Sequence, residues 1–239
     1  MFKIEELTPD CDLNEGLVLN IDKPLMWTSA DVVRKLKYIL RRIGYRKIKI
    51  GHAGTLDPLA TGVLLVCIGR ATKQVEALQA GRKEYIADVQ LGATTPSYDL
   101  EHPIDATFPW EHITPESVEA ALQSLCGERD QIPPVYSAKM IDGRRAYEYA
   151  REGSEVEMRL AHINIYGIEL LECDLPHIRI RVDCSKGTYI RSLAREIGEA
   201  LNSGAHLTSL RRTRSGDYLA DDGISVEESI NILESLKKN

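Results

Sequence analysis

The chain places one acidic side chain, Asp57, in a glycine-flanked loop with the sequence GHAGTLDPLATG, residues 51–62. Glycines at 51, 54 and 62 permit positive φ and a close approach of the backbone to a ligand. Pro58 fixes its own φ and restricts Asp57 to extended geometry, so the carboxylate is suited to act as a held nucleophile. Asp-Pro is also typical of a helix start with Asp as the N-cap, and the local pattern alone leaves that alternative open.

The loop lies between a predicted basic helix and a predicted apolar strand. Residues 16–22 predict a buried strand, and the helix after it is capped by Thr28 or Ser29 and stopped by Gly44. Residues 63–68 predict the strand that follows the loop. Further along the chain we expect a helix over 72–80, a strand over 83–91, a long loop over 92–113, a helix from 114 to Gly127, a strand over 177–184, a helix capped by Thr188, a strand around 206–212 and a final helix over 225–237 with a capping box at Ser225.

These elements mix without strict βαβ alternation, which favours an α+β fold in a single domain over residues 1–239. The longest apolar run, residues 63–68, is far shorter than a membrane span. The acidic N-terminus has no signal-peptide pattern, and the five cysteines are odd in number and lack any CxxC pair. We therefore expect a cytoplasmic protein with no membrane contact and no metal site, and no feature requires more than a monomer.

The net charge of −6 argues, taken alone, against a polyanionic partner, but the basic residues are clustered. Residues 31–50 carry eight basic side chains against one acid. Smaller basic clusters lie at Arg82-Lys83, Arg144-Arg145 and Arg211-Arg212-Arg214. A solvated helix face would explain the first cluster. Several clusters beside the Asp57 loop favour a nucleic-acid surface instead.

The Asp57 segment and six further motifs in order along the chain resemble those of the TruB family of tRNA pseudouridine synthases. The Asp57 segment, GHAGTLDPLATGVLLVCIGRATK, resembles the catalytic signature of that family. The other motifs are NIDKP with TS and DVV from residue 20, KEY from 83, LGATT to Asp99 from 91, IPP to Gly153 from 132, SKGTYIRSLA from 185, and 206–212. The resemblance covers nearly the whole chain. It implies a pseudouridine synthase fold, with a central, mostly antiparallel mixed sheet flanked by helices and an inserted RNA-gripping thumb loop at about 131–153.

The resemblance implies conversion of uridine-55 in the T loop (T arm) of tRNA to pseudouridine. This isomerisation needs no redox change or group donor, so no cofactor is expected. Asp57 would be the nucleophile, attacking either the uracil ring or the ribose C1′, and the residues leave both routes open. Arg191 would oppose the effect of burial on the Asp57 carboxylate, since arginine stays charged and bonds a carboxylate through two donors. Tyr85 would accept the proton in the final step.

The target base is stacked in folded RNA and must be extruded before attack. By the same resemblance, Tyr85 and Tyr189 would contact the extruded base, Leu210 would pack on it, and Asp99 would bond the uracil edge. His52 would fill the space left in the RNA. Tyrosine, leucine and a lone histidine are more often structural, and the motifs alone favour the functional interpretation. The side chains expected to touch phosphates are Lys73, Arg144 and Arg145.

The chain departs from the family pattern at three places. Met26 stands where the first motif usually has glycine, and if that glycine serves a tight turn the local backbone here must differ. Lys139-Met140 is reversed relative to the usual order after Tyr-Ser-Ala, and no C-terminal PUA domain is recognised. Two other classes remain: a non-catalytic RNA-binding or tRNA-folding module, which would not need Asp57 with Arg191, and an aspartate-nucleophile hydrolase, for which the chain has no metal-ligand cluster or phosphate-binding motif.

Overall fold

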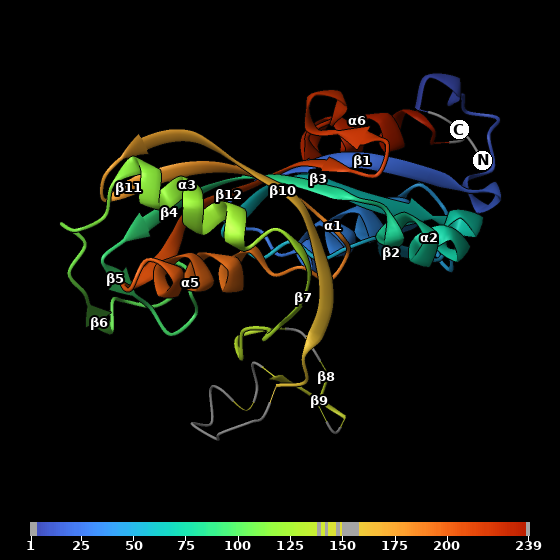
Figure 1. Ribbon diagram of the computed structural model, residues 1–239. Coiled ribbons are helices and arrows are strands. Elements are labelled where there is room, and N and C mark those ends of the chain that lie inside the picture. The colour runs from blue at the N-terminus through green and yellow to red at the C-terminus, as the bar shows by residue number, and fades with distance from the viewer. Residues whose placement is uncertain (1–3, 138–139, 142, 147–148, 150–157, 238–239) are drawn as a thin grey trace. The chain divides into compact units, whose positions relative to one another are not determined.

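The computed structural model describes residues 4–137, 140–141, 143–146, 149 and 158–237. The chain divides into two compact units, one comprising Met1–Glu84 with Arg211–Asn239 and the other Tyr85–Leu210. Figure 1 labels most of the helices and strands named below. The division passes through β4 (Lys83–Leu91) and β12 (Ala205–Ser215), so each unit holds part of both strands. The single domain over 1–239 stays a prediction.

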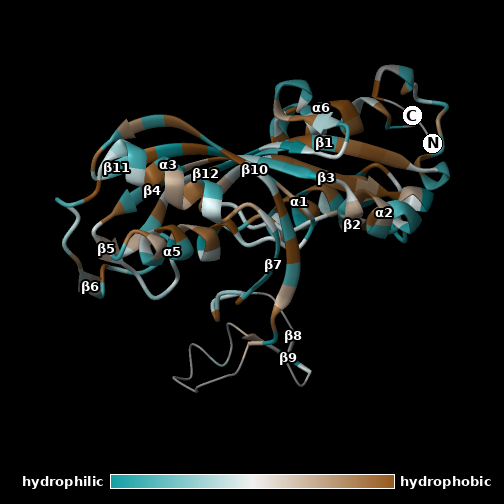
Figure 2. Ribbon diagram, in the orientation of Figure 1, coloured by the Kyte–Doolittle hydropathy of each residue, from teal (hydrophilic) through white to brown (hydrophobic). Residues whose placement is uncertain are grey.

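The first unit is built on the antiparallel pair β1 (Leu17–Lys23) and β3 (Ala60–Ile68), with the last residues of β12 next in order. Nearly every residue of β1 and β3 is buried, and Figure 2 shows the apolar colour along them. A continuous apolar run of this kind is typical of a strand covered on both faces. β2 (Ile50–His52) pairs with the end of β3, and β13 (Tyr218–Leu219) pairs with the end of β12.

Two amphipathic helices of this unit begin with capping boxes. Thr28 and Asp31 cap α1 (Ser29–Arg42), and Ser225 and Glu228 cap α6 (Val226–Ser235), each pair exchanging side-chain and backbone bonds. α6 packs against α1 and β1. The remaining short elements are η1 (Ile4–Glu6), η2 (Leu13–Glu15), η3 (Gly69–Gln74), α2 (Val75–Ala80) and η4 (Ala220–Asp222).

The second unit has the strand order β12-β4-β11-β10-β7. β10 (Ala161–Asp174) and β11 (His177–Cys184) form an antiparallel hairpin with two register shifts, and β7 (Gly127–Gln131) pairs with the start of β10. α3 (Pro115–Ser124) packs on β10 and on α5 (Ile190–Ala200). The described part of this unit also holds four two-residue strands: β5 (Ala93–Thr94) with β6 (Ala106–Thr107), and β8 (Met140–Ile141) with β9 (Arg144–Arg145).

The α+β class and the mostly antiparallel mixed sheet are confirmed, as are the strands over 83–91 and 177–184. The predicted cap at Thr188 is wrong: Tyr189 is the N-cap of α5, and the Thr188 hydroxyl donates to the Ser185 carbonyl at 3.0 Å. The predicted helix over 72–80 is 3₁₀ up to Gln74 and α-helical only from Val75. The predicted thumb loop, 131–153, is described only in part, since residues 138–139, 142, 147–148 and 150–153 lie outside the described residues.

Met26 adopts the left-handed conformation that glycine would take, with φ of 67°. Its N–H donates to the Pro58 carbonyl at 2.9 Å, and its side chain is 70% exposed. A residue with a Cβ pays about 1–2 kcal/mol in this region. We therefore expect the free energy of unfolding of the Met26→Gly variant to be about 1 kcal/mol higher than that of the Met26→Ala variant. Urea denaturation of both variants measures this difference.

The control for the Met26 pair is Ala120, an exposed position in the α3 helix. There, glycine is expected to be the less stable residue by about 1 kcal/mol. If alanine were more stable than glycine at position 26 by the same amount as at position 120, this would contradict a strained backbone at Met26.

Candidate active site

Asp57 lies in a tight turn that leads directly into a strand. The Asp57 carbonyl accepts from the Ala60 N–H at 3.0 Å, with Pro58 as the first central residue of the turn. β3 begins at Ala60, so no helix follows the Asp-Pro pair. The alternative of Asp57 as a helix N-cap is therefore wrong, and its side chain is half-buried.

The residues on either side of Asp57 are fixed through their main chains. The Ser29 hydroxyl donates to the Leu56 carbonyl at 3.0 Å and accepts from the Leu56 N–H at 2.8 Å. The Pro58 carbonyl accepts from the Met26 N–H and, at 3.4 Å, from the Lys23 ammonium. None of these bonds uses the Asp57 side chain, so the main chain around Asp57 is held independently of the carboxylate.

A third anchor comes from Arg212, which is only 2% exposed. Its guanidinium donates to the carbonyls of Val63 at 2.8 Å, Gly54 at 3.1 Å and Thr55 at 3.4 Å. Gly62 lies so close that a Cβ there would stand 2.2 Å from the Arg212 carbonyl oxygen. Of the predicted special glycines, Gly54 and Gly62 have positive φ, whereas Gly51 is an ordinary residue of β2.

Lys23 is fully buried at the end of β1, and its ammonium donates to the carbonyls of Pro24 at 2.9 Å and Trp27 at 2.5 Å. Burial lowers the pKa of Lys23 to about 8, and the nearby charge of Arg212 adds to this. The negative charge of Asp57 acts in the opposite direction. The ammonium and the carboxylate are therefore electrostatic neighbours, and Lys23 ties the 24–27 turn to the Asp57 loop.

The lowered pKa of Lys23 predicts a pH-dependent stability. The unfolded chain keeps this proton up to about pH 10.5, but the folded chain loses it near pH 8. Between these values the unfolded state binds more protons, so the contribution of Lys23 to stability rises with pH. We expect the unfolding free energy of the wild type to rise relative to that of Lys23→Met from pH 7 to pH 9.5, measured by urea denaturation.

Titrations of the other groups are shared by the wild type and Lys23→Met and cancel in the difference. A difference that stays constant with pH, or that falls, would contradict the lowered pKa of Lys23.

His52 ends β2, five residues before Asp57. Its ring is half-buried, and Nδ1 is buried with no hydrogen-bond partner among the described residues. Burial lowers the pKa of His52, and Arg212 adds to this effect, so the neutral ring is favoured. Lys73, by contrast, is exposed on η3.

The predicted basic clusters differ in exposure. Lys83 is 5% exposed and donates to the Gly81 carbonyl at 2.6 Å, and Arg211 forms a two-pronged pair with Asp22 at 2.9 and 3.0 Å. With Arg212 also buried, these residues serve the fold, and the prediction of an RNA-facing surface is wrong for Lys83 and Arg212. Arg82 is exposed, and so are all eight basic residues of the 31–50 cluster on α1 and the segment after it: Arg34, Lys35, Lys37, Arg41, Arg42, Arg46, Lys47 and Lys49.

In the second unit, Arg191 is 4% exposed in the first turn of α5. Its guanidinium donates to the carbonyls of Ser97 at 3.2 Å and Tyr136 at 2.9 Å. Arg191 Nε lies 3.7 Å from Oδ2 of Asp99. Asp99 Oδ1 accepts from the Ser97 hydroxyl at 2.6 Å and from the Glu101 N–H at 2.9 Å. The structure thus brings together two predicted site residues, Arg191 and Asp99.

The other predicted residues of this unit lie on neighbouring elements. Tyr189 precedes Arg191 as the N-cap of α5 and is half-buried. Tyr85, 8% exposed, is on β4, and half-buried Leu210 is on the adjacent strand β12. Arg144 is exposed, with its guanidinium 4.7 Å from the centre of the Tyr149 ring, whereas the side chain of Arg145 lies outside the described part.

The sequence interpretation gave no site role to Lys23, Ser29 or Arg212. Lys23 and Ser29 stand in the quoted first motif, where a lysine inside an apolar strand signals a buried charge with a special function. Arg212 stands in a cluster of basic residues in the sequence, and it differs from the surface arginines only in being buried, which the sequence does not show. Among the described residues, no three histidine, cysteine or acidic side chains are grouped to hold a metal. No described helix is long and apolar enough to cross a membrane.

The chain is similar to a chain of a crystallised Cbf5-Nop10-Gar1 complex, with a TM-score of 0.72 and 33% identity. The match covers 97% of this chain and 58% of the other. A chain of the archaeal box H/ACA sRNP Nop10-Cbf5 complex matches with a TM-score of 0.68 and 30% identity, covering 100% of this chain and 60% of that one. The fold is that of the pseudouridine synthases.

Sequence comparisons define the family. Residues 41–190 match the N-terminal domain of TruB family pseudouridylate synthases, and residues 191–237 match the C-terminal domain of tRNA pseudouridylate synthase B. The tRNA pseudouridine synthase B of Phocaeicola vulgatus is 63% identical over 217 residues, covering 90% of this chain and 92% of the relative. That of Flavobacterium johnsoniae is 52% identical, covering 94% and 100%. The chain belongs to the TruB family of pseudouridylate synthases, which are isomerases.

Proposed function

We propose that this protein converts uridine-55 in the T loop of tRNA to pseudouridine, with Asp57 as the nucleophile. The observation that carries the proposal is the Asp57 turn, which occurs in a TruB family segment and is anchored through Leu56 and Pro58. Relatives at 52–63% identity are tRNA pseudouridine synthases B, which supports tRNA as the substrate.

The reaction breaks the bond between N1 of uracil and C1′ of the ribose, and forms a bond between C5 and C1′. The proton on C5 leaves to water and N1 gains a proton, so atoms and electrons balance with no further reactant. Asp57 attacks either uracil C6 or ribose C1′ and holds the intermediate while the base turns. A carboxylate whose backbone is fixed on both sides starts from a defined position, which reduces the ordering that attack requires.

The remaining residues take roles around the extruded base. Tyr85 accepts the C5 proton, and Tyr189 and Leu210 contact the ring. Arg191 supplies a fixed cation, and Asp99, which already lies 3.7 Å from Arg191 and accepts two protein hydrogen bonds, offers its remaining acceptor capacity to the uracil edge. His52, favoured in its neutral form, suits insertion among stacked bases. Phosphates would be contacted by Lys73, Arg144 and Arg145, with the exposed basic residues of α1 adding attraction for RNA.

The test is incubation with tRNA transcripts tritiated at C5 of uracil, because only isomerisation at C5 releases the label to water while the base stays in the chain. We expect stoichiometric release at one uridine per tRNA, and none from a transcript with cytidine at position 55. Free uracil in solution would indicate a hydrolase instead. Tight tRNA binding without release would indicate a non-catalytic RNA-binding protein.

A further inference from the structure

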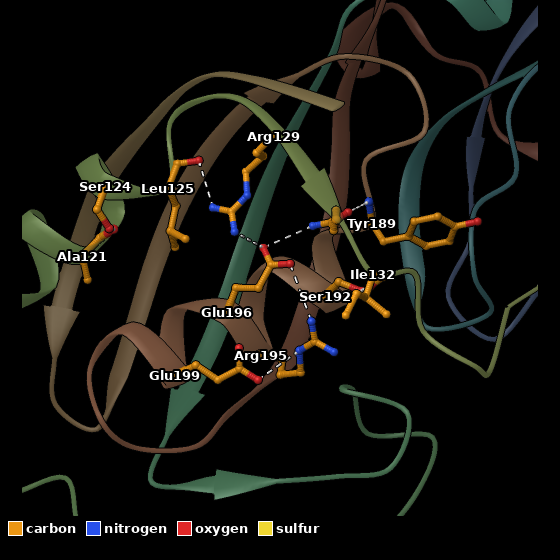
Figure 3. A network of polar contacts seen from close by, with 11 residues as sticks. Ala121, Ser124, Leu125, Arg129, Ile132, Tyr189, Ser192, Arg195, Glu196 and Glu199 are labelled. Atoms are coloured by element: carbon orange, nitrogen blue, oxygen red, sulfur yellow. Dashed lines mark hydrogen bonds and ion pairs between the residues drawn. The ribbon is translucent and has the colours of Figure 1, made fainter. Parts of the chain in front are cut away.

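Beside Arg191, the same helix buries a second charged group that the proposed chemistry does not use. Glu196, on α5, is 7% exposed. Figure 3 shows its carboxylate with the neighbouring side chains of Arg129 and Arg195. Its Oε2 lies 3.4 Å from a guanidinium nitrogen of Arg129 and 3.4 Å from the amide nitrogen of Gln131. Its Oε1 lies 3.7 Å from Arg195. Burying a carboxylate is costly unless it is paired and hydrogen-bonded, and Glu196 has partners of both kinds.

Gln131 connects this carboxylate to the start of α5. It is the last residue of β7 and is fully buried. Its amide nitrogen donates to Glu196, and its amide oxygen accepts from the Tyr189 N–H at 2.8 Å. An amide can serve both ends only in one orientation, with nitrogen toward the acid and oxygen toward Tyr189. Glu196 therefore selects the orientation in which Gln131 receives the Tyr189 N–H.

The start of α5 depends on such help from outside the helix. Tyr189 occupies the N-cap position but its side chain makes no capping bond. One turn later, the Ser192 hydroxyl donates to the carbonyl of Ile132, the residue after Gln131, at 2.7 Å. The first turn of α5, which carries Tyr189 and Arg191, is thus fastened at two points to the end of β7.

We propose that Glu196 and Gln131 are positioning residues for the isomerisation. Together they set the first turn of α5 and so the placement of Tyr189 and Arg191 against the target uridine. This inference rests on the proposed function, since the value of a fixed Tyr189 and Arg191 depends on their roles there. It predicts a loss of rate at saturating tRNA rather than a loss of tRNA affinity.

The test compares Gln131→Met, Glu196→Ala and Glu196→Gln. Methionine has nearly the shape of glutamine but neither donates nor accepts these bonds, so we expect single-turnover tritium release at saturating tRNA to slow by about 10- to 100-fold. The tRNA dissociation constant should stay within about twofold. Glu196→Ala should behave alike, whereas Glu196→Gln keeps an oxygen for the Gln131 amide and should recover most of the rate.

The matched control is Arg179→Met, which removes the pair of Arg179 with Asp88 on neighbouring strands of the same unit without touching α5. Its rate should stay within about twofold. A positioning role further predicts faster hydrogen exchange at the Tyr189 amide in Gln131→Met, by about tenfold, measured without RNA. This readout stands even if the wild type releases no tritium, an outcome that would reject the proposed function alone.

Three results would overturn the inference. The rate in Gln131→Met could be unchanged, or this variant could lose tRNA affinity and keep its rate. The third is a fall in rate that is no larger than the fraction of unfolded protein in the sample accounts for. Equal rates for Glu196→Gln and Glu196→Ala would show that the hydrogen bond from Gln131 to Glu196 does not affect the reaction, and Glu196 would then not be a positioning residue. An unchanged hydrogen-exchange rate at the Tyr189 amide in Gln131→Met would show that the bond from this amide to Gln131 does not hold the start of α5.

Discussion

Asp57→Asn is expected to lower tritium release by about 10⁴-fold or more while tRNA binding stays within a few-fold of the wild type. Asparagine has the shape of aspartate, but its amide is not a nucleophile. The turn should survive the change because its bonds run through Leu56, Pro58 and Ala60 main-chain groups. Tritium release under single-turnover conditions and filter binding of the same tRNA measure the two quantities.

The control for this variant is Asp22→Asn, which changes another half-buried acid of the same unit. Asp22 pairs with Arg211, so its loss tests the general effect of removing a carboxylate. Activity of this control should stay within about threefold. Loss of tRNA binding in a folded Asp57→Asn protein would instead assign Asp57 a structural or binding role.

Arg191→Lys should have the second largest effect, a fall of about 10²-fold in single-turnover rate. Lysine keeps the positive charge but offers no planar fork of donors. Arg191 uses that fork to reach the Ser97 and Tyr136 carbonyls while its Nε lies near Asp99. A single ammonium cannot maintain all three contacts, so the cation shifts from its place. We choose lysine because removing the charge would leave the Asp99 carboxylate buried beside no cation.

Arg181→Lys provides the comparison, because Arg181 pairs with Glu169 on the surface of the same unit. Its rate should be unchanged, since exposed pairs contribute little. A wild-type rate in Arg191→Lys would show that charge alone is sufficient and would contradict the need for a fixed guanidinium.

Local pattern predicted much of the fold. The cap at Thr28, one of two residues offered for it, the capping box at Ser225 and the alternation over 177–184 involve neighbours in sequence, and the structure bears them out. β10 was not predicted because two register shifts break its alternation. β7 was not predicted because its residues, Gly-Glu-Arg-Asp-Gln, are polar and it gains its place by pairing with β10.

Candidate site residues could be predicted from the sequence where they stand in a motif. They could not be predicted where the role of a residue depends on whether its side chain is buried. Asp57, Arg191 and Asp99 were located from their motifs, and the last two lie together. Arg212 and Lys83 were assigned to a basic surface because charge in a sequence carries no information on exposure. Both bury their charged groups against backbone carbonyls that come from other segments or from the preceding turn.

The clamp from Arg212 to the 54–63 segment has a consequence for the order of events during synthesis. Arg212 bonds Val63 across 149 residues of sequence, and Gly54 across 158. A ribosome must therefore add almost the whole chain after the Asp57 segment before that clamp can form. The nascent protein carries the proposed nucleophile early but completes the support for it last, so we expect newly made chains to acquire activity only when β12 is in place.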